Sequence, residues 1–100
     1  MNASDEETSP LRATVTIRYC PRCRWMTRAA WLAQELLTTF PTELAVTLMP
    51  APSGTFEVRL GDGVIFSRAA EGRFPEPKEL KQRIRDVIDP GRDLGHSDRG

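Results

Sequence analysis

The spacing of apolar residues predicts two strands in the first half of the chain. Ala13–Tyr19 (ATVTIRY) alternates between apolar and polar side chains and is rich in β-branched residues, which is typical of a strand. Leu44–Met49 (LAVTLM) is almost continuously apolar. This second segment fits either a parallel strand covered on both faces or an amphipathic strand with Thr47 outward, and the sequence leaves both interpretations open.

Between these strands the spacing of apolar residues becomes helical. Six of them follow one another in steps of four, three, four, one and three, and therefore lie on one stripe of a helix. They are Trp25, Ala29, Leu32, Leu36, Leu37 and Phe40. We expect the helix to end at Pro41, because proline cannot continue the ladder of backbone hydrogen bonds.

The next segments predict a β-hairpin between two loops. Thr55–Leu60 alternates cleanly between apolar and polar residues, and Val64–Ser67 is a second short strand pattern. The intervening Gly61-Asp62-Gly63 has the turn chemistry that supplies positive φ angles. Loops are expected at residues 50–54 and 72–77, which contain Pro and Gly.

The last predicted element is a helix. Its apolar stripe consists of Leu80, Ile84, Val87 and Ile88, and Pro77 suits its first turn. The order of elements is therefore β-α-β-β-β-α, and the strand–helix–strand unit implies parallel pairing through a right-handed crossover. We expect an α/β fold of the thioredoxin-like type, with a four-stranded mixed sheet and two covering helices.

Composition and charge narrow the class of protein. The 100 residues are 39% hydrophobic and 28% charged, which fits one globular domain. Lys and Arg (14) balance Asp and Glu (14), so there is no basic excess of the kind that favours nucleic acid. No apolar run approaches the roughly 20 residues of a membrane span, and the polar start does not resemble a secretory signal. We therefore expect a cytoplasmic protein that binds neither nucleic acid nor membranes.

Both ends of the chain are predicted to lie outside the folded domain. Residues 1–10 are acidic and polar, and residues 89–100 (DPGRDLGHSDRG) are rich in Gly, Asp and Arg. We expect the first to be a disordered tail and the second a flexible one, with the folded domain at residues 11–88. The only histidine, His96, lies in the second tail and is assigned no function.

Two cysteines carry the candidate chemistry, and they lie two residues apart in Cys20-Pro21-Arg22-Cys23, where the first strand meets the first helix. We expect the thiols to lie in the first helical turn, where backbone N–H groups, the helix dipole and nearby arginines favour a thiolate. About 3% of an ordinary thiol, with a pKa of about 8.5, is ionised at pH 7, and a pKa lower by roughly 1.5 units would ionise about half. The spacing also allows an intramolecular disulfide, so the pair is predicted to be redox-active.

Two other interpretations of the cysteine pair stay open. Zinc usually takes four Cys or His ligands, so a metal would have to be shared across a dimer. Cysteine is also among the most often buried residue types, and both residues could simply pack in the core. In a reducing cytoplasm, a lone pair is more typical of catalysis or metal binding than of a structural disulfide.

Several segments resemble, in order and at compatible spacing, the selenoprotein W-like family, also called the Rdx family, which groups selenoproteins W, T and H. They are CPRC (residues 20–23), SGTFEV (53–58), GVIFSR (63–68) and GRFPEPKEL (72–80). The resemblance covers Val15 to about Ile88. It implies a thioredoxin-like Rdx domain with thiol oxidoreductase activity tied to glutathione or thioredoxin. We expect no bound cofactor or metal. The selenoprotein members carry selenocysteine at the second position of the pair, where this chain has Cys23.

The sequence does not decide which cysteine is the nucleophile. The resemblance implies Cys23, because it occupies the selenocysteine position. Thioredoxin-style geometry instead favours Cys20, the more amino-terminal and usually the more exposed thiol. We expect Cys20 to attack, with Cys23 as the alternative.

A groove beside the cysteines is expected to receive the substrate or partner. Pro21 and Arg22 lie between the two thiols. Thioredoxin-like proteins usually carry a proline facing the cysteines at the start of the third strand, and Pro52 could fill this role if its peptide bond were cis. Ser53 and Gly54 are the better candidates, since they would line the site with exposed backbone.

Other residues near the pair allow a functional and a structural interpretation. Trp25 is predicted to pack in the core, with a lid over the thiols as the alternative. Trp31 falls off the helical stripe and is expected to be partly exposed, where it could anchor a partner. Four arginines near the pair could steer an anionic thiol such as glutathione or form a solvated surface: Arg18, Arg22, Arg24 and Arg28.

The leading hypothesis is a thiol–disulfide oxidoreductase in which Cys20 and Cys23 cycle between dithiol and disulfide, with glutathione or thioredoxin as the redox partner. The alternative is a protein-binding module whose cysteines regulate docking without turnover. A metal-binding dimer is the third hypothesis.

Overall fold

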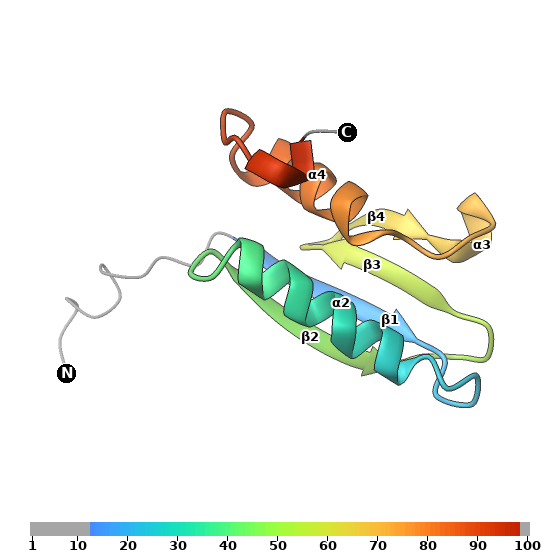
Figure 1. Ribbon diagram of the computed structural model, residues 1–100. Helices are drawn as coiled ribbons and strands as arrows, with labels where there is room; N and C mark the ends of the chain where they lie inside the picture. Colours follow the sequence, from blue (N-terminus) through green and yellow to red (C-terminus); the bar gives the residue numbers. More distant parts are fainter. Residues whose placement is uncertain (1–12, 99–100) are drawn as a thin grey trace, which may run out of the picture.

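The computed structural model describes residues 13–98; the predicted tail at residues 1–10 and the side chain of His96 lie outside the described residues. Within that part the chain forms a four-stranded sheet with helices (Figure 1). The elements are β1 (Ala13–Tyr19), α2 (Met26–Thr39), β2 (Leu44–Pro50), β3 (Phe56–Leu60), β4 (Gly63–Ser67), α3 (Arg68–Glu71), α4 (Pro77–Ile88) and the 3₁₀ helix η1 (Gly95–Asp98).

The sheet has the strand order β2-β1-β3-β4. β1 pairs with β2 in parallel and with β3 in antiparallel, so that Ile17 lies opposite Leu48 on one side and Val58 on the other. β3 and β4 form the antiparallel hairpin. The predicted mixed α/β sheet of the thioredoxin-like type is confirmed.

The two faces of the sheet differ in character because side chains alternate along each strand. Val15, Ile17 and Tyr19 are buried on one face, whereas Thr14 is exposed and Thr16 is only partly covered on the other. Both long helices cover the buried face: α2 lies along β1 and β2, and α4 lies beside α2 and over β4 (Figure 1). The opposite face of the sheet has no helix on it within the described residues.

β2 is an edge strand with mixed burial. Leu44 is buried, Val46 and Leu48 are partly buried, and Thr47 and Met49 are exposed. Of the two interpretations of this segment, the amphipathic strand with Thr47 outward is therefore the correct one.

The core is one cluster that joins the inner face of the sheet to the two long helices. Its buried members are Val15, Ile17, Tyr19, Ala29, Leu32, Ala33, Leu36, Phe40, Leu44, Phe56, Val58, Phe66, Leu80 and Ile84. The predicted helical stripes contribute most of their residues to this cluster. Leu37 and Val87 are exceptions, with exposed fractions of 39% and 63%.

The connection from β4 to α4 contains a short helix that the sequence pattern did not predict. The Ser67 side chain accepts a hydrogen bond from the N–H of Ala70 and caps α3, and Gly72 ends it at φ +75°. At the start of α4, Glu76 and Glu79 form a reciprocal capping box, with Pro77 in the first turn as expected.

The segment after α4, predicted as a flexible tail, makes specific contacts as far as residue 98. Arg92 forms an ion pair with Glu43 at 2.9 Å and donates to the carbonyl of Thr39. Arg85 on α4 pairs with Asp98 at 2.8 Å. Residues 89–98 therefore lie against α4 and the loop before β2. Across the described residues, no helix combines the length and apolar character needed to cross a bilayer.

Candidate redox site

The cysteine pair lies at the end of the central strand β1. Cys20 follows Tyr19 directly, has no exposed surface, and forms a disulfide with Cys23; their Cα atoms are 5.4 Å apart. The pair is therefore attached to an interior strand, because β1 has hydrogen-bonded neighbours on both sides. The close approach of the two sulfurs agrees with a redox-active pair.

The loop between the cysteines is a compact turn rather than helix. Residues 21–24 are in turn conformation, with the N–H of Arg24 donating to the carbonyl of Pro21. Arg24 itself has φ +62°, a left-handed conformation that is uncommon for residues other than Gly. Trp25 is the residue that precedes the first turn of α2. The turn thus places the two sulfurs together before the helix starts.

This geometry corrects the expectation that the thiols lie in the first helical turn. α2 begins at Met26, three residues after Cys23. The donor that meets a sulfur is instead the backbone N–H of Cys23, which lies 3.2 Å from the Sγ of Cys20. The pattern placed the helix too early because Trp25, a core-packing residue, extends the apolar stripe beyond the helix itself.

The exposure of the two cysteines is the reverse of what we expected for an attacking Cys20. Cys20 is fully buried, whereas Cys23 is partly exposed. The reason is the position of Cys20 at the buried end of β1, while Cys23 lies on the surface turn. Of the two cysteines, Cys23 is therefore the one accessible from solvent.

The residues predicted to line the groove lie at the same end of the sheet as the cysteines. Pro21 and Arg22 are exposed on the turn. The N–H of Ala51 donates to the carbonyl of Tyr19 at 2.8 Å, which places the loop after β2 beside the start of the cysteine turn. Ser53 and Gly54 are exposed in that loop, and Gly54 has φ +82°.

Pro52 does not have the cis peptide bond that its predicted role opposite the cysteines requires. The described residues contain no cis peptide bond, so Pro52 follows a trans bond and is exposed. The carbonyl of Pro52 accepts the N–H of Thr55, so this residue belongs to the turn before β3.

An aromatic cluster packs directly behind the cysteine turn. Trp25 meets Phe74 edge-on with ring centroids 4.9 Å apart, and Phe56 lies 6.2 Å from Trp25 and 5.3 Å from Phe74. The predicted core role of Trp25 is confirmed. Sequence analysis did not single out Phe74, because it comes from the loop between α3 and α4 and reaches Trp25 only through the tertiary fold.

Two arginines stack on this aromatic cluster. The guanidinium carbon of Arg28 lies 3.9 Å from the centroid of Phe74, and that of Arg68 lies 4.9 Å from both Phe74 and Trp25. Arg68 falls within the segment GVIFSR, and no sequence pattern marks it as a site residue. Cation–π contacts of this kind are favourable and become stronger when they are desolvated.

A shallow groove of about 390 Å³ lies over the first turns of α2. It is lined by Arg24, Trp25, Thr27, Arg28 and Trp31. The exposed fraction of Trp31 is 46%, which confirms the expectation that it is partly exposed.

Of the four arginines expected near the pair, Arg18 is engaged elsewhere. It lies on the open face of the sheet and forms an ion pair with Glu57 at 2.9 Å, and Arg59 binds the same carboxylate at 2.8 Å. Burial opposes ionisation of Glu57, but the hydrogen bonds from both arginines lower its pKa. Arg18 is therefore not part of the positive charge around the disulfide.

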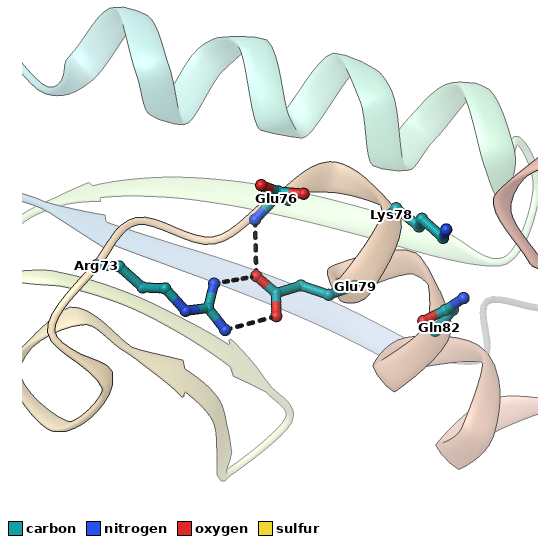
Figure 2. A pocket seen from close by; sticks show the side chains of 5 residues that line it. All are labelled: Arg73, Glu76, Lys78, Glu79 and Gln82. Atoms are coloured by element: carbon teal, nitrogen blue, oxygen red, sulfur yellow. Dashed lines mark hydrogen bonds and ion pairs between the residues drawn. The ribbon is translucent and has the colours of Figure 1, made fainter. Parts of the chain in front are cut away.

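A second hollow of about the same volume, about 390 Å³, lies at the start of α4. Figure 2 shows that Arg73 and the backbone N–H of Glu76 both point at the carboxylate of Glu79, while Lys78 and Gln82 lie on the side of Glu79 away from Arg73. The hydrogen bonds from Arg73 bring the pKa of Glu79 to about 2. The charges here cap α4 and attach it to the preceding loop, so the groove over α2 is the better candidate for binding. Arg24 of the cysteine turn lines that groove, whereas the predicted groove residues Pro21, Arg22, Ser53 and Gly54 do not.

Among the described residues, no group of three or more His, Cys, Asp or Glu side chains is placed to hold a metal ion.

Fold and site together define a thioredoxin-like α/β protein with a C-x-x-C disulfide. The family model of the Rdx family matches residues 14–86, and the chain belongs to this family. Membership indicates a thioredoxin-like redox function.

Two solved structures support the assignment. The chain is 51% identical to a selenoprotein W-related protein from Vibrio cholerae, with a TM-score of 0.76 over 78% of this chain and 99% of that one. It is 45% identical to a protein from Bordetella parapertussis, with a TM-score of 0.73 over 75% of this chain and 96% of that one. No curated protein matches the chain.

Proposed function

We propose that this protein is a thiol–disulfide oxidoreductase in which Cys23 attacks the substrate and Cys20 resolves the intermediate. The observation that carries the proposal is the disulfide between a fully buried Cys20 and a partly exposed Cys23 at the end of the central strand. The family supports the same chemistry.

The forward reaction takes place in two exchange steps. The Cys23 thiolate bonds to one sulfur of a substrate disulfide, the substrate S–S bond breaks, and the other substrate sulfur leaves as a thiolate that takes a proton from water. The Cys20 thiolate then bonds to the sulfur of Cys23, and the second substrate sulfur leaves in the same way. Two electrons pass to the substrate and the protein becomes the disulfide.

The buried position of Cys20 suits the second step. Its sulfur faces Cys23 rather than solvent, and the N–H of Cys23 donates to it. Hydrogen bonds to an ionised sulfur are stronger than those to a neutral one, so this donor would favour Cys20 as a thiolate during resolution.

The cycle closes when two molecules of glutathione, or the dithiol of a thioredoxin, reduce the Cys20–Cys23 disulfide. We place the cycle in the cytoplasm, where such donors keep thiols reduced.

A redox titration tests this proposal. The protein is equilibrated in glutathione buffers of increasing ratio of oxidised to reduced form, alkylated, and weighed by mass spectrometry. We expect one two-electron transition between the dithiol and the intramolecular disulfide. The absence of that disulfide at every ratio would contradict the two-cysteine cycle.

Single-cysteine variants assign the two roles. Cys20→Ser should accumulate a stable mixed disulfide with glutathione at Cys23, because the resolving thiol is missing. Cys23→Ser should form little mixed disulfide, because Cys20 is covered. The opposite pattern would assign the attack to Cys20. Far-UV circular dichroism of each variant controls for folding.

The partly exposed Trp31 beside the groove favours a second candidate function, a redox-regulated binding module without turnover. A module of this kind would bind its partner in both single-cysteine variants while the wild-type protein showed no sustained reduction of any disulfide substrate. Multiple turnover with glutathione as donor would exclude it.

A further inference from the structure

Most arginines of the described chain have a carboxylate partner, and the exceptions lie together. Six of the ten arginines in residues 13–98 form ion pairs: Arg18, Arg59, Arg73, Arg83, Arg85 and Arg92. The other four, which we call the unpaired arginines, have no carboxylate partner among the described residues: Arg22, Arg24, Arg28 and Arg68. Two of them lie on the cysteine turn, and the other two stack on the aromatic cluster behind it.

Two of the unpaired arginines, Arg28 and Arg68, contact the aromatic cluster, and no carboxylate within residues 13–98 neutralises their charge. Arg28 from α2 and Arg68 from α3 both contact the ring of Phe74, so two guanidinium groups from different elements meet at one side chain. The Nε of Arg68 is buried and has no hydrogen-bond partner in the described structure. The two positively charged guanidinium groups repel each other, and an anion bound beside them would reduce this repulsion.

The segments around Arg22, Arg24 and Arg28 carry no acidic side chain: the cysteine turn and the loop at residues 51–55 contain none, and neither does the first turn of α2. Glu71, which shares α3 with Arg68, is paired with Arg73 and Arg83. The nearest carboxylate along α2 is Glu35, which is already paired with Lys81 at 3.0 Å. The positive charge therefore faces outward, toward whatever approaches Cys23.

The same surface exposes a large apolar side chain. Trp31 lines the groove and has an exposed fraction of 46%. Trp, Met and Arg are the residue types enriched at protein–protein interfaces, and Trp and Arg are frequent hot spots. A small thiol compound would need the positive charge but not this exposed apolar surface.

We infer that this surface docks an acidic segment of a partner protein, with carboxylates against Arg24 and Arg28 and a cysteine of the segment at Cys23. This inference rests on the proposed function, because it names the substrate of the same exchange reaction. The apolar part of the segment would lie on Trp31. The partner is thus a protein disulfide flanked by Asp or Glu.

Two peptide disulfides test the inference. Each is a disulfide-linked homodimer of a five-residue peptide with a central Cys, flanked by Asp and Glu in one and by Asn and Gln in the other. The reduced protein is mixed with each, and its oxidation is followed by stopped-flow tryptophan fluorescence. Each rate is divided by the rate of the same peptide with dithiothreitol, an uncharged dithiol, so that intrinsic differences between the disulfides cancel.

We expect the acidic peptide to react about 10-fold faster than the neutral one at about 0.01 M salt, and the advantage to fall below about 2-fold at about 1 M salt. Equal normalised rates at low salt would overturn the inference while leaving the oxidoreductase in place. No reaction with either peptide would overturn the proposed function instead. The two failures are therefore distinguishable.

A second experiment with small molecules distinguishes a protein substrate from a small anionic disulfide. Oxidised glutathione is compared with the uncharged bis(2-hydroxyethyl) disulfide under the same normalisation. A charge advantage clearly smaller than that of the acidic peptide supports a protein partner. An advantage as large or larger would overturn the docking inference in favour of a small anionic disulfide.

Charge variants locate the surface. Arg28→Gln should lower the ratio of acidic to neutral rate about 3-fold, and the double variant Arg24→Gln/Arg28→Gln should bring it close to one. Arg59→Gln removes the same charge from the open face of the sheet and should leave the ratio within about 1.5-fold of wild type. Equal effects of Arg28→Gln and Arg59→Gln would show that only overall charge matters and would overturn the assignment to this surface. The salt dependence of the wild-type protein provides the test if a variant folds poorly.

Discussion

The backbone N–H of Cys23 donates to the Sγ of Cys20 at 3.2 Å, and only Cys23 of the two reaches the surface. The turn that joins them thus gives the two sulfurs different environments within four residues. Cys23 meets solvent, while Cys20 meets the core and an amide donor.

Cys23 should react with alkylating agents at least about 10-fold faster than Cys20 in the reduced protein, because a covered thiol must await local opening. Reduced protein is treated with iodoacetamide at pH 7 for increasing times, and the two sites are quantified by peptide mass spectrometry. Unfolded protein in urea is the control, where the two rates should converge. Faster modification of Cys20 would contradict the assignment of roles.

Phe74→Leu should lower the free energy of unfolding by about 1–2 kcal/mol. The substitution removes the edge-on contacts with Trp25 and Phe56 and the ring on which two guanidinium groups stack. Urea unfolding of the oxidised protein measures the change. Val87→Ala, at a position with 63% exposure, is the control and should change stability by less than about 0.5 kcal/mol.

Arg24→Gly should leave stability unchanged or raise it by about 0.5 kcal/mol, because glycine adopts φ +62° without strain while making the unfolded chain more flexible. Arg24→Val should lower it by roughly 1 kcal/mol or more, since a β-branched side chain opposes this conformation. Thermal unfolding of both variants under oxidising conditions gives the comparison. A valine variant as stable as the glycine variant would show that the turn does not keep this conformation in solution.

The Arg73–Glu79 pair should make the protein less stable in acid. The hydrogen bonds from Arg73, together with the backbone N–H of Glu76 and the charge of Arg83, lower the pKa of Glu79 from 4.5 to about 2. These interactions therefore contribute their full stability above about pH 4.5 and lose it as the pH falls toward 2. The shift of about 2.5 units corresponds to at most about 3 kcal/mol, and exposure of the pair reduces this to about 1 kcal/mol. Urea unfolding at several pH values measures the loss.

Glu79→Gln is the informative variant for that measurement. Its stability should be lower than wild type at pH 7, and the difference should shrink by about 1 kcal/mol between pH 4.5 and pH 2. Asp62→Asn changes an exposed carboxylate in the β3–β4 turn and should leave the acid profile unaltered. A difference between Glu79→Gln and wild type that does not vary with pH would show that the ion pair contributes nothing.

The sequence predicts most of the fold because strand and helix periodicities are local signals. Ala13–Tyr19 has the predicted bounds, and the hairpin strands differ by one residue at their starts. The start of α2 was placed too early, since an apolar residue at the right spacing does not reveal a turn with positive φ before it. α3 was missed because its four residues are too few to show a period.

The candidate site was only half predictable, for a different physical reason. The cysteine pair and the exposed Trp31 follow from motif and spacing. The burial of Cys20 and the contact of Phe74 with Trp25 depend on which strand lies at the centre of the sheet and where the chain returns after α3. Segments far apart in the sequence fix those features, and no local pattern contains them.

Although Lys and Arg balance Asp and Glu in the whole sequence, the unpaired charges of the described residues are unevenly distributed. The unpaired arginines mark the end of the sheet where β1 finishes. The unpaired carboxylate of Asp62 lies in the turn beside Thr14, where β1 begins, and Asp89 and Asp93 flank the Arg92 that holds the chain near the start of β2. In the electric field of a negatively charged neighbour, this charge distribution favours an orientation in which the disulfide end of the molecule faces that neighbour before contact.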